Sequence, residues 1–187
     1  MKQKKINLGD LIFILFYKYG GEIKGSTTLQ KLIDIIRLDS EFEVDVNYSP
    51  YDYGDFATQV NDIIQVYQDN NWVTKKKVQF QADKRINIYN LTPTGSKIAK
   101  TLTDNLLSSE LKALNILDKF EKKEQKDIIS FSYFWYPKTA VNSKIKDDIF
   151  EKKSIFSNLE GDLEKEYNSI ISSGYSVKDV IRESWRC

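Results

Sequence analysis

The chain has 187 residues, of which 41% are apolar and 13% aromatic, so it can bury a sizeable core. Its 28 basic residues nearly balance its 27 acidic residues, which argues against a global basic field for nucleic acid. It has no His and a single Cys, Cys187, which excludes His-based catalysis, His metal sites and internal disulfides.

No apolar run approaches the roughly 18 to 20 residues that cross a bilayer. The segment from Leu11 to Phe16 follows a lysine cluster, but Asp10 interrupts it and no small-residue cleavage site comes after it. We therefore expect a cytoplasmic protein. Adjacent carboxylates such as Asp147 and Asp148 do not point the same way on a helix, so we assign no metal, no cofactor and no catalytic residue, and expect no enzyme.

Two helices are predicted at the start of the chain. Apolar residues recur at helical spacing over residues 8–19, and Gly20 and Gly21 would end this first helix. A second helix is predicted over residues 28–39, with Ser26 or Thr27 as its cap. Its apolar positions are Leu29, Leu32, Ile33 and Ile36.

A tyrosine-rich connector over residues 47–54 leads into a third helix. Pro50 excludes a helix interior, Gly54 is a natural breaker, and Asp55 stands where a helix N-terminus favours an anion. We therefore predict the third helix over residues 55–70. The tyrosines of the connector could stack on bases or a ligand, but packing of the turn on the core is favoured.

The spacing of the apolar residues then changes from about 3.6 to about 2. Alternation from Trp72 to Phe80 and from Ile86 to Leu91, with polar residues 81–84 between, predicts a β-hairpin. Residues 92–95 lead into a further helix, whose apolar positions are Ile98, Ala99, Leu102 and Leu106.

Three helices, a two-stranded hairpin and another helix are the order of a winged-helix domain, in which the hairpin is the wing. We therefore expect a mostly α protein with a small β-hairpin, in the α+β class. The expected architecture is a winged helix-turn-helix over residues 1–106 followed by a C-terminal helical extension. The alternative is an unrelated α+β domain with a small hairpin.

Residues 107–187 are predicted to form that helical extension, packed on the first domain, because no linker composition separates the two. The dense aromatic run at residues 131–136 is interpreted as a core helix that breaks at Pro137, in preference to an oligomer interface. The last amphipathic segment contains Tyr175 and Trp185. It could bind a partner or a second copy, or dock on its own domain.

Four short motifs follow one another in a fixed order. They are Thr28 to Leu32, Tyr48 to Gly54, Tyr89 to Gly95 and Trp135 to Ile145. In order and spacing they resemble the YwgA-like family and the related Panacea (SocA-like antitoxin) domains, over roughly residues 8–150. The resemblance implies a winged-helix-like fold and a role in regulation, toxin neutralisation or defence, with no catalytic residue. The family has Pro where this chain has Asp55, so family contacts at that turn are not carried over.

Charge is distributed unevenly over the predicted winged helix. The third helix holds Asp55, Asp62 and Asp69 and no Lys or Arg, so phosphate would repel it. Residues 74–85 hold five basic residues against one acid, Asp83, for a local charge of +4. The five are Lys75, Lys76, Lys77, Lys84 and Arg85, and Lys2, Lys4 and Lys5 form a second cluster. The wing lysines either contact phosphate or keep an exposed edge strand from pairing.

Two functions remain open from the sequence. The first is a DNA-binding regulator, of transcription for example, that contacts the duplex backbone through the wing residues. The second is a protein-interaction module, such as an antitoxin-like protein or defence-system adaptor. It would bind a toxin or another protein through the acidic third helix or through the C-terminal segment with Tyr175 and Trp185. A homodimer is the default expectation for either.

Overall fold

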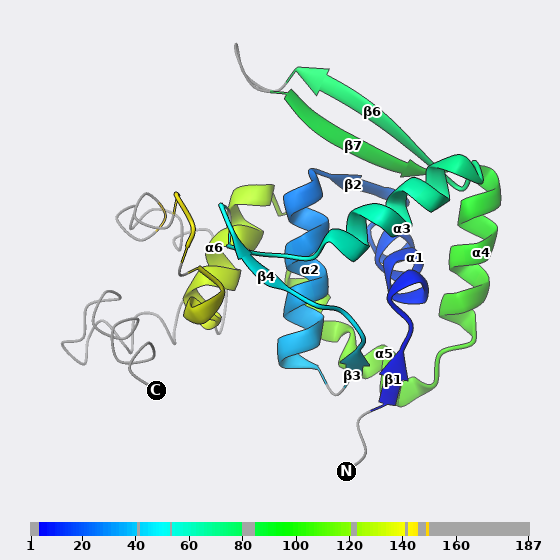
Figure 1. Cartoon of the computed structure of the whole chain (residues 1–187). Coiled ribbons are helices and arrows are strands. Elements are labelled where there is room, and N and C mark those ends of the chain that lie inside the picture. Colours follow the sequence, from blue (N-terminus) through cyan, green and yellow to red (C-terminus); the bar gives the residue numbers. More distant parts are fainter. Residues whose placement is uncertain are drawn as a thin grey trace. The chain divides into compact units, whose positions relative to one another are not determined.

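Helices and short strands alternate along the chain in the computed structural model, which confirms the α+β class (Figure 1). The structure describes residues 4–40, 42–52, 54–79, 85–120, 123–140, 142–145 and 149. The chain divides into two compact units. The first comprises Met1–Tyr48 and Ala57–Gln125, and the second comprises Ser49–Phe56 and Lys126–Cys187. The predicted helices beyond residue 150, with Tyr175 and Trp185, lie outside the described residues.

The first two helices lie close to where the sequence predicts them. Helix α1 spans Leu8–Lys18, and the side chain of Asn7 caps it by accepting from the Gly9 N–H at 2.7 Å. Helix α2 spans Ser26–Asp39. Its N-cap is Gly25, with a φ of 89° and no side-chain cap, so the prediction that Ser26 or Thr27 caps this helix was wrong. The chain turns into the helix at a backbone conformation that glycine adopts readily.

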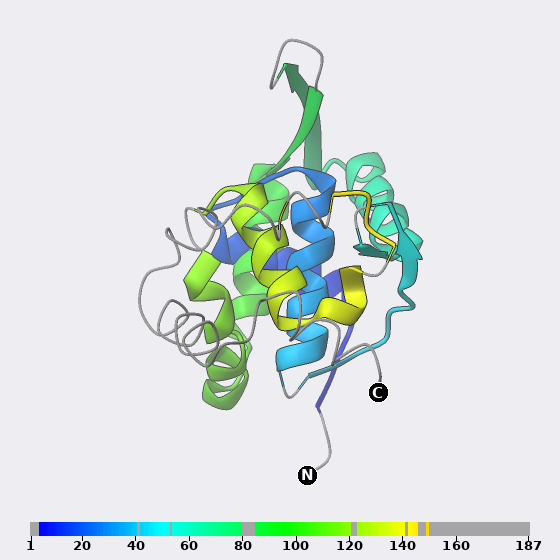
Figure 2. The ribbon, with the colours of Figure 1, turned by 90° about the vertical axis from the view of Figure 1, so that its left-hand side faces the viewer.

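The hairpin belongs to a three-stranded antiparallel sheet rather than standing alone. Strands β6 (Val73–Gln79) and β7 (Arg85–Leu91) form the predicted hairpin, and β2 (Glu22–Lys24) pairs with the other edge of β7. The strand order is therefore β2-β7-β6. Both views show the hairpin extending away from the helices of the first unit (Figures 1 and 2).

A second, two-stranded pairing was also not predicted. Strand β1 (Lys4–Ile6) pairs in parallel with β3 (Phe42–Val44), directly after α2. Ile6, Phe42 and Val44 are buried in this pair. This pairing brings the start of the chain next to the residues that follow α2. In the sequence, α1, β2 and α2 lie between the two paired strands.

The third helix begins later than predicted. Helix α3 spans Thr58–Asp69, and Asp55 lies before it in the short strand β5 (Gly54–Phe56), so the expected start at Asp55 was wrong. Strand β5 pairs with β4 (Ser49–Tyr51), and its first residue, Gly54, lies opposite Tyr51 with a φ of 85°. The helix breaker thus belongs to a tight strand pair in the second unit, and not to a helix N-terminus.

Three further helical segments complete the first unit. Helix α4 spans Pro93–Asp104, and the hydroxyl of Thr92 caps it by accepting from the Gly95 N–H at 3.1 Å. Helix α5 (Ser108–Ala113) and the 3₁₀ helix η1 (Asn115–Phe120) follow. Residues beyond 106 therefore contribute to the same compact unit as the helices and sheet before them.

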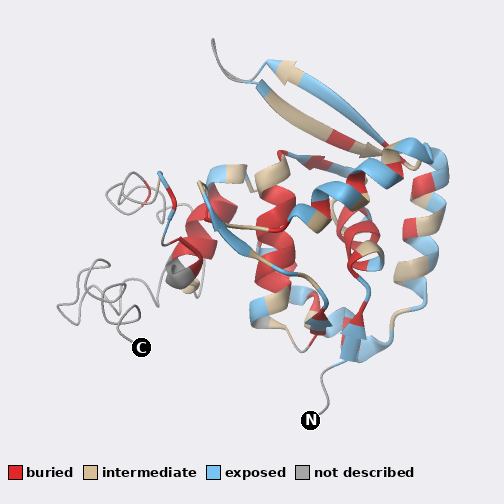
Figure 3. Ribbon diagram, viewed as in Figure 1, coloured by how far each residue is buried: buried red, intermediate tan, exposed pale blue. Residues whose placement is uncertain are grey.

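Helices α1 and α2 supply much of the buried core of the first unit, and Figure 3 shows both mostly buried. Their fully buried apolar residues are Leu11, Ile12, Leu15 and Phe16 in α1 and Leu32, Ile33, Ile35 and Ile36 in α2. Burying one such side chain contributes about 1.5–3 kcal/mol. The two helices thereby fix the platform on which α3, α4 and the sheet are held.

The second unit has its own small core. Helix α6 spans Gln125–Trp135 and the 3₁₀ helix η2 spans Pro137–Ala140, so the predicted break at Pro137 is confirmed. Ile129, Tyr133, Ala140 and Ile149 form a buried cluster. Phe131 and Tyr133 are buried, as expected of a core helix. Lys144 ties this unit together: its N–H donates to the Asp52 carbonyl at 2.8 Å, and its ammonium contacts the Asp52 carboxylate at 2.7 Å.

No helix in the described part of the chain is both long enough and apolar enough to cross a membrane.

Candidate nucleic-acid interface

The hairpin presents its basic side chains on two opposite faces. Side chains alternate along a strand, so Lys75 and Lys77 share one face of β6 while Lys76 points to the other. The register pairs Gln79 with Arg85, which places Arg85 on the same face as Lys75 and Lys77. We call these three residues the inner basic face. The sequence alone does not assign the hairpin cations to one face or the other, because that assignment depends on the strand register.

The inner basic face continues from the buried base of the hairpin. Val73 and Tyr89 lie on the same face and are buried, and Ile23 of β2 pairs with Tyr89. The ammonium of Lys75 lies 5.9 Å from the centre of the Tyr89 ring, within cation–π distance. The face is therefore apolar at its root and basic toward its tip. Lys84, the fifth predicted cation, lies outside the described residues.

The outer face is basic too, but less so. Lys24 of β2 and Lys76 of β6 both lie opposite Ile88 in the register, one on each side. The ammonium of Lys24 is 3.4 Å from the carboxylate of Glu22 on the same strand. Half of the outer charge is therefore compensated locally.

Several basic side chains outside the hairpin form ion pairs, whereas the described hairpin cations do not. Lys4 forms an ion pair with Glu110, and Lys5 with Glu43 at 3.3 Å, so the two described members of the expected N-terminal cluster are locally compensated. Among the residues that the structure describes, none pairs in this way with the hairpin cations. The four described hairpin cations are Lys75, Lys76, Lys77 and Arg85, and all four are exposed.

Helix α3 has the opposite character. Asp62 and Asp69 are both exposed on it, and the helix contains no Lys or Arg. Asp55, the third acid of the predicted set, belongs to β5 in the other unit, so the structure does not bring all three onto one helix. The exposed positions of α3 are otherwise neutral: Thr58, Asn61, Gln65 and Val66. A major-groove approach by this helix would bring carboxylates toward phosphates.

Two residues of the motifs that resemble the YwgA-like and Panacea proteins, Gln30 and Gly95, have clear structural roles in the first unit. Gln30 is buried and bridges to the N-cap residue of α3: its amide donates to the Ala57 carbonyl at 2.9 Å and accepts from the Ala57 N–H at 3.0 Å. Gly95 lies so close to the Trp72 carbonyl that no side chain fits there. No protein-family model and no curated protein matches this chain. Both motif residues are explained by the packing of the first unit alone.

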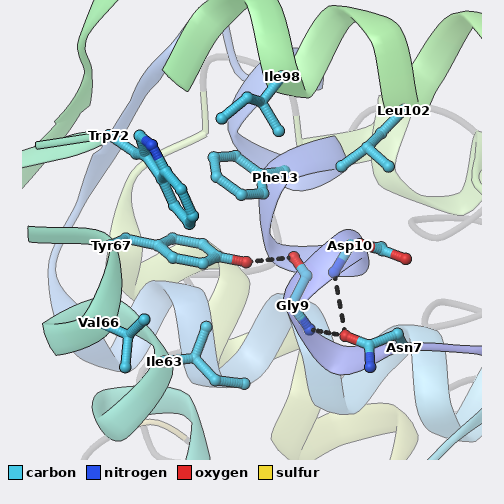
Figure 4. Close-up of a pocket in the computed structure, with 10 residues that line it drawn as sticks. All are labelled: Asn7, Gly9, Asp10, Phe13, Ile63, Val66, Tyr67, Trp72, Ile98 and Leu102. Carbon is cyan, nitrogen blue, oxygen red and sulfur yellow. Dashed lines mark hydrogen bonds between the residues drawn. The ribbon is translucent and has the colours of Figure 1, made fainter. Parts of the chain in front are cut away.

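An open cavity of about 530 Å³ lies between α1, α3 and α4 within the first unit (Figure 4). Its lining residues are Asn7, Gly9, Asp10, Phe13, Ile63, Val66, Tyr67, Trp72, Ile98 and Leu102. Seven of these ten are apolar or aromatic, which favours an apolar ligand group. Sequence reasoning missed this site because its walls come from segments far apart in the chain.

Three aromatic rings form the inner wall of the cavity. Phe13 stacks on Tyr67 with a centroid distance of 4.2 Å, and Trp72 lies 5.9 Å from Phe13 and 5.7 Å from Tyr67. The Tyr67 hydroxyl donates to the Gly9 carbonyl at 2.7 Å. Burial, and to a lesser extent the nearby charge of Asp10, raise the pKa of Tyr67 above its ordinary value. The tyrosine is therefore a neutral, fixed part of the wall.

Among the described residues, no group of three or more His, Cys, Asp or Glu side chains is placed to hold a metal ion. The hairpin and the cavity are thus the two surface features that suggest binding.

Proposed function

We propose that this protein is a non-enzymatic winged-helix regulator that binds the backbone of duplex DNA through its basic hairpin. One observation carries the proposal: Lys75, Lys76, Lys77 and Arg85 are exposed on an extended hairpin and form no ion pair with a described residue. Cations without acidic partners release phosphate counterions on binding without first breaking an internal ion pair.

The element order supports the winged-helix part of the proposal. The chain runs α1, β2, α2, α3, β6, β7, and the short strand β2 joins the hairpin in a sheet of order β2-β7-β6. A helix-turn-helix with a three-stranded sheet whose last two strands project as a hairpin is the pattern of that fold. The resemblance to the YwgA-like and Panacea proteins points the same way.

The mode of binding we propose uses the wing and not the third helix. Asp62 and Asp69 would repel phosphate, so α3 stays out of the groove while the inner basic face (Lys75, Lys77, Arg85) contacts the backbone. Backbone contacts position a protein but carry little sequence information. We therefore propose weak intrinsic sequence preference, with specificity supplied by a partner or by DNA shape.

A salt titration tests the proposal. Binding of a fluorescein-labelled duplex of mixed sequence is measured by fluorescence anisotropy over a range of salt concentrations. Each phosphate contact contributes about −0.9 to the slope of log K against log salt, so replacing Lys75, Lys76 and Lys77 by Ala should flatten the slope by up to about 2.7. The matched control replaces Lys97, Lys112 and Lys119, which are exposed cations in the same unit, and removes the same charge.

The two triple variants distinguish the effect of charge on the hairpin from the effect of the total charge of the protein on DNA binding. The proposal requires the hairpin variant to lose affinity and salt dependence while the control keeps both. Absence of binding at low salt, or equal losses in the two variants, would overturn it. A second comparison tests the face: Lys75→Ala with Lys77→Ala should weaken binding more than Lys24→Ala with Lys76→Ala, although both pairs remove two charges.

A further inference from the structure

The cavity between α1, α3 and α4 has an apolar floor that continues to the surface. Phe13 and Tyr67 are buried at its base, whereas Val66 at its edge is 50% exposed. Figure 4 shows Val66 and Ile63 on α3 across from Leu102 and Ile98 on α4, with the aromatic rings between them. A half-exposed valine beside an open apolar cavity leaves a contact surface that the described residues do not cover.

One exposed acid lines the cavity, and two more flank Val66 at its edge on α3. Asp10 of α1 lines the cavity and is exposed. Asp62 and Asp69 stand four residues before and three residues after Val66, so all three lie on one side of α3. Both acids are exposed.

No basic side chain lines the cavity. None of the ten lining residues is Lys or Arg, α3 contains neither, and the exposed Lys97 of α4 stands next to the lining residue Ile98 without being part of the wall. On α4, the positions at helical spacing from Ile98 on its surface side are Thr94, Thr101 and Asn105, which are all uncharged. The two lysines before α1 that the structure describes are already paired with Glu110 and Glu43.

We propose that this acidic-rimmed cavity is the docking site for a basic, amphipathic segment of a partner protein. One large apolar side chain of the segment enters the cavity against Phe13 and Trp72, and Lys or Arg residues beside it meet Asp10 on one wall and Asp62 and Asp69 on the other. The volume of about 530 Å³ suits one or two large side chains. Nucleic acid is a poor occupant, since phosphates would face three carboxylates. The site goes beyond the proposed DNA contact, because it shares no residue with the inner basic face.

A pair of synthetic peptides tests the docking site on the full chain. The first is an amphipathic peptide of Leu and Lys with Leu at helical spacing, and the second carries Glu at every Lys position. Trp72 reports binding by its fluorescence when Trp135→Phe and Trp185→Phe leave it as the sole tryptophan. The Leu/Lys peptide should change the Trp72 emission, and added salt should weaken its binding. The Glu peptide should leave the emission unchanged.

Matched variants distinguish peptide binding at the cavity from nonspecific hydrophobic binding elsewhere on the surface. Val66→Lys should weaken the Leu/Lys peptide by about tenfold or more, as for an apolar contact central to an interface. Leu111→Lys changes an equally exposed apolar residue on α5 of the same unit and should have no more than about a twofold effect. Replacing Asp62 and Asp69 by Lys should shift the preference toward the Glu peptide.

Three results would overturn the proposal. They are equal Trp72 responses to the two peptides, equal effects of Val66→Lys and Leu111→Lys, and tighter Val66-dependent binding of a single-stranded oligonucleotide than of the Leu/Lys peptide. Circular dichroism of each variant keeps the test valid, because Val66, Asp62 and Asp69 are exposed and their replacement should leave the helical signal unchanged. A docking site without DNA binding would leave this inference standing while the proposed function fails.

Discussion

Replacing Gly95 by Ala sets two physical effects against each other. Gly95 lies in the first turn of α4, where Ala is the better helix former by about 1 kcal/mol. A Cβ at this position, however, would lie 2.0 Å from the Trp72 carbonyl oxygen, 2.9 Å from its carbon and 3.2 Å from Cδ2 of Leu91. Helix propensity alone predicts stabilisation, and the close approach predicts the reverse.

The obstructing group is backbone and is held in place. The Trp72 carbonyl accepts from the Thr92 N–H at 2.9 Å and from the Thr92 hydroxyl at 3.2 Å, and this hydroxyl also caps α4. Relieving the clash must therefore move α4 away from the base of the hairpin. Overpacking costs about 1–3 kcal/mol and a weakened hydrogen bond about 0.5–1.5 kcal/mol more, so the net destabilisation is about 0.5–3.5 kcal/mol after the propensity gain of about 1 kcal/mol.

Urea unfolding followed by circular dichroism measures the difference. Thr101→Ala is the control, because Thr101 is exposed in the same helix. Its hydroxyl donates to the Lys97 carbonyl one turn earlier at 2.9 Å, so the substitution should act mainly through helix propensity, with a stabilisation of a few tenths of a kcal/mol. If Gly95→Ala is as stable as the unchanged chain or more stable, the packing of α4 against Trp72 is not as close as the structure has it.

Two further substitutions test the interior of the first unit. Gln30→Ala removes both hydrogen bonds to Ala57; the Ala57 carbonyl still accepts from the Val60 N–H at 3.2 Å, but the buried Ala57 N–H loses its partner. The free energy of urea unfolding should therefore fall by about 1–3 kcal/mol, and a loss below about 0.5 kcal/mol would contradict the bridge. Asp34→Asn tests a buried carboxyl, because burial, opposed by the hydrogen bond and charge of Arg37, raises the pKa of Asp34 above its ordinary value of 3.8. The folded state then holds the proton more tightly than the unfolded state. The free energy of unfolding of the unchanged chain, relative to that of Asp34→Asn, should be highest below the ordinary pKa and fall as the pH rises through the raised pKa. A difference that grows with pH would refute the burial argument.

Long periodic segments were predictable from sequence, and short pairings were not. The apolar period of α1 and the alternation in β6 and β7 predict all three elements nearly at their observed bounds. Strand β2 has three residues, too few for an alternation to be visible, and only its pairing with β7 identifies it. At Gly54 the sequence showed a break but not its geometry, and a strand pair replaced the expected helix start at Asp55.

The candidate surfaces follow the same division. The exposure of the hairpin lysines was predictable from composition, but the separation of Lys76 from Lys75 and Lys77 needed the strand register. The cavity was not predictable, because Asp10, Val66 and Leu102 lie on three helices and only tertiary packing brings them together. Asp10 was considered only as a residue that interrupts an apolar run.

The second unit is assembled from two pieces of chain that are made at different times. Residues 57–125, which belong to the first unit, lie between its strand pair and α6. At a synthesis rate of about 5–20 residues per second, β4 and β5 emerge from the ribosome roughly 3–14 s before the segment that carries Lys144 begins to follow. An isolated strand pair is marginally stable in water. During this interval the pair therefore lacks the stabilising contact between Lys144 and Asp52. Truncating the chain after η1 would therefore remove α6 and keep β4 and β5, so no single cut in the sequence separates the two units intact.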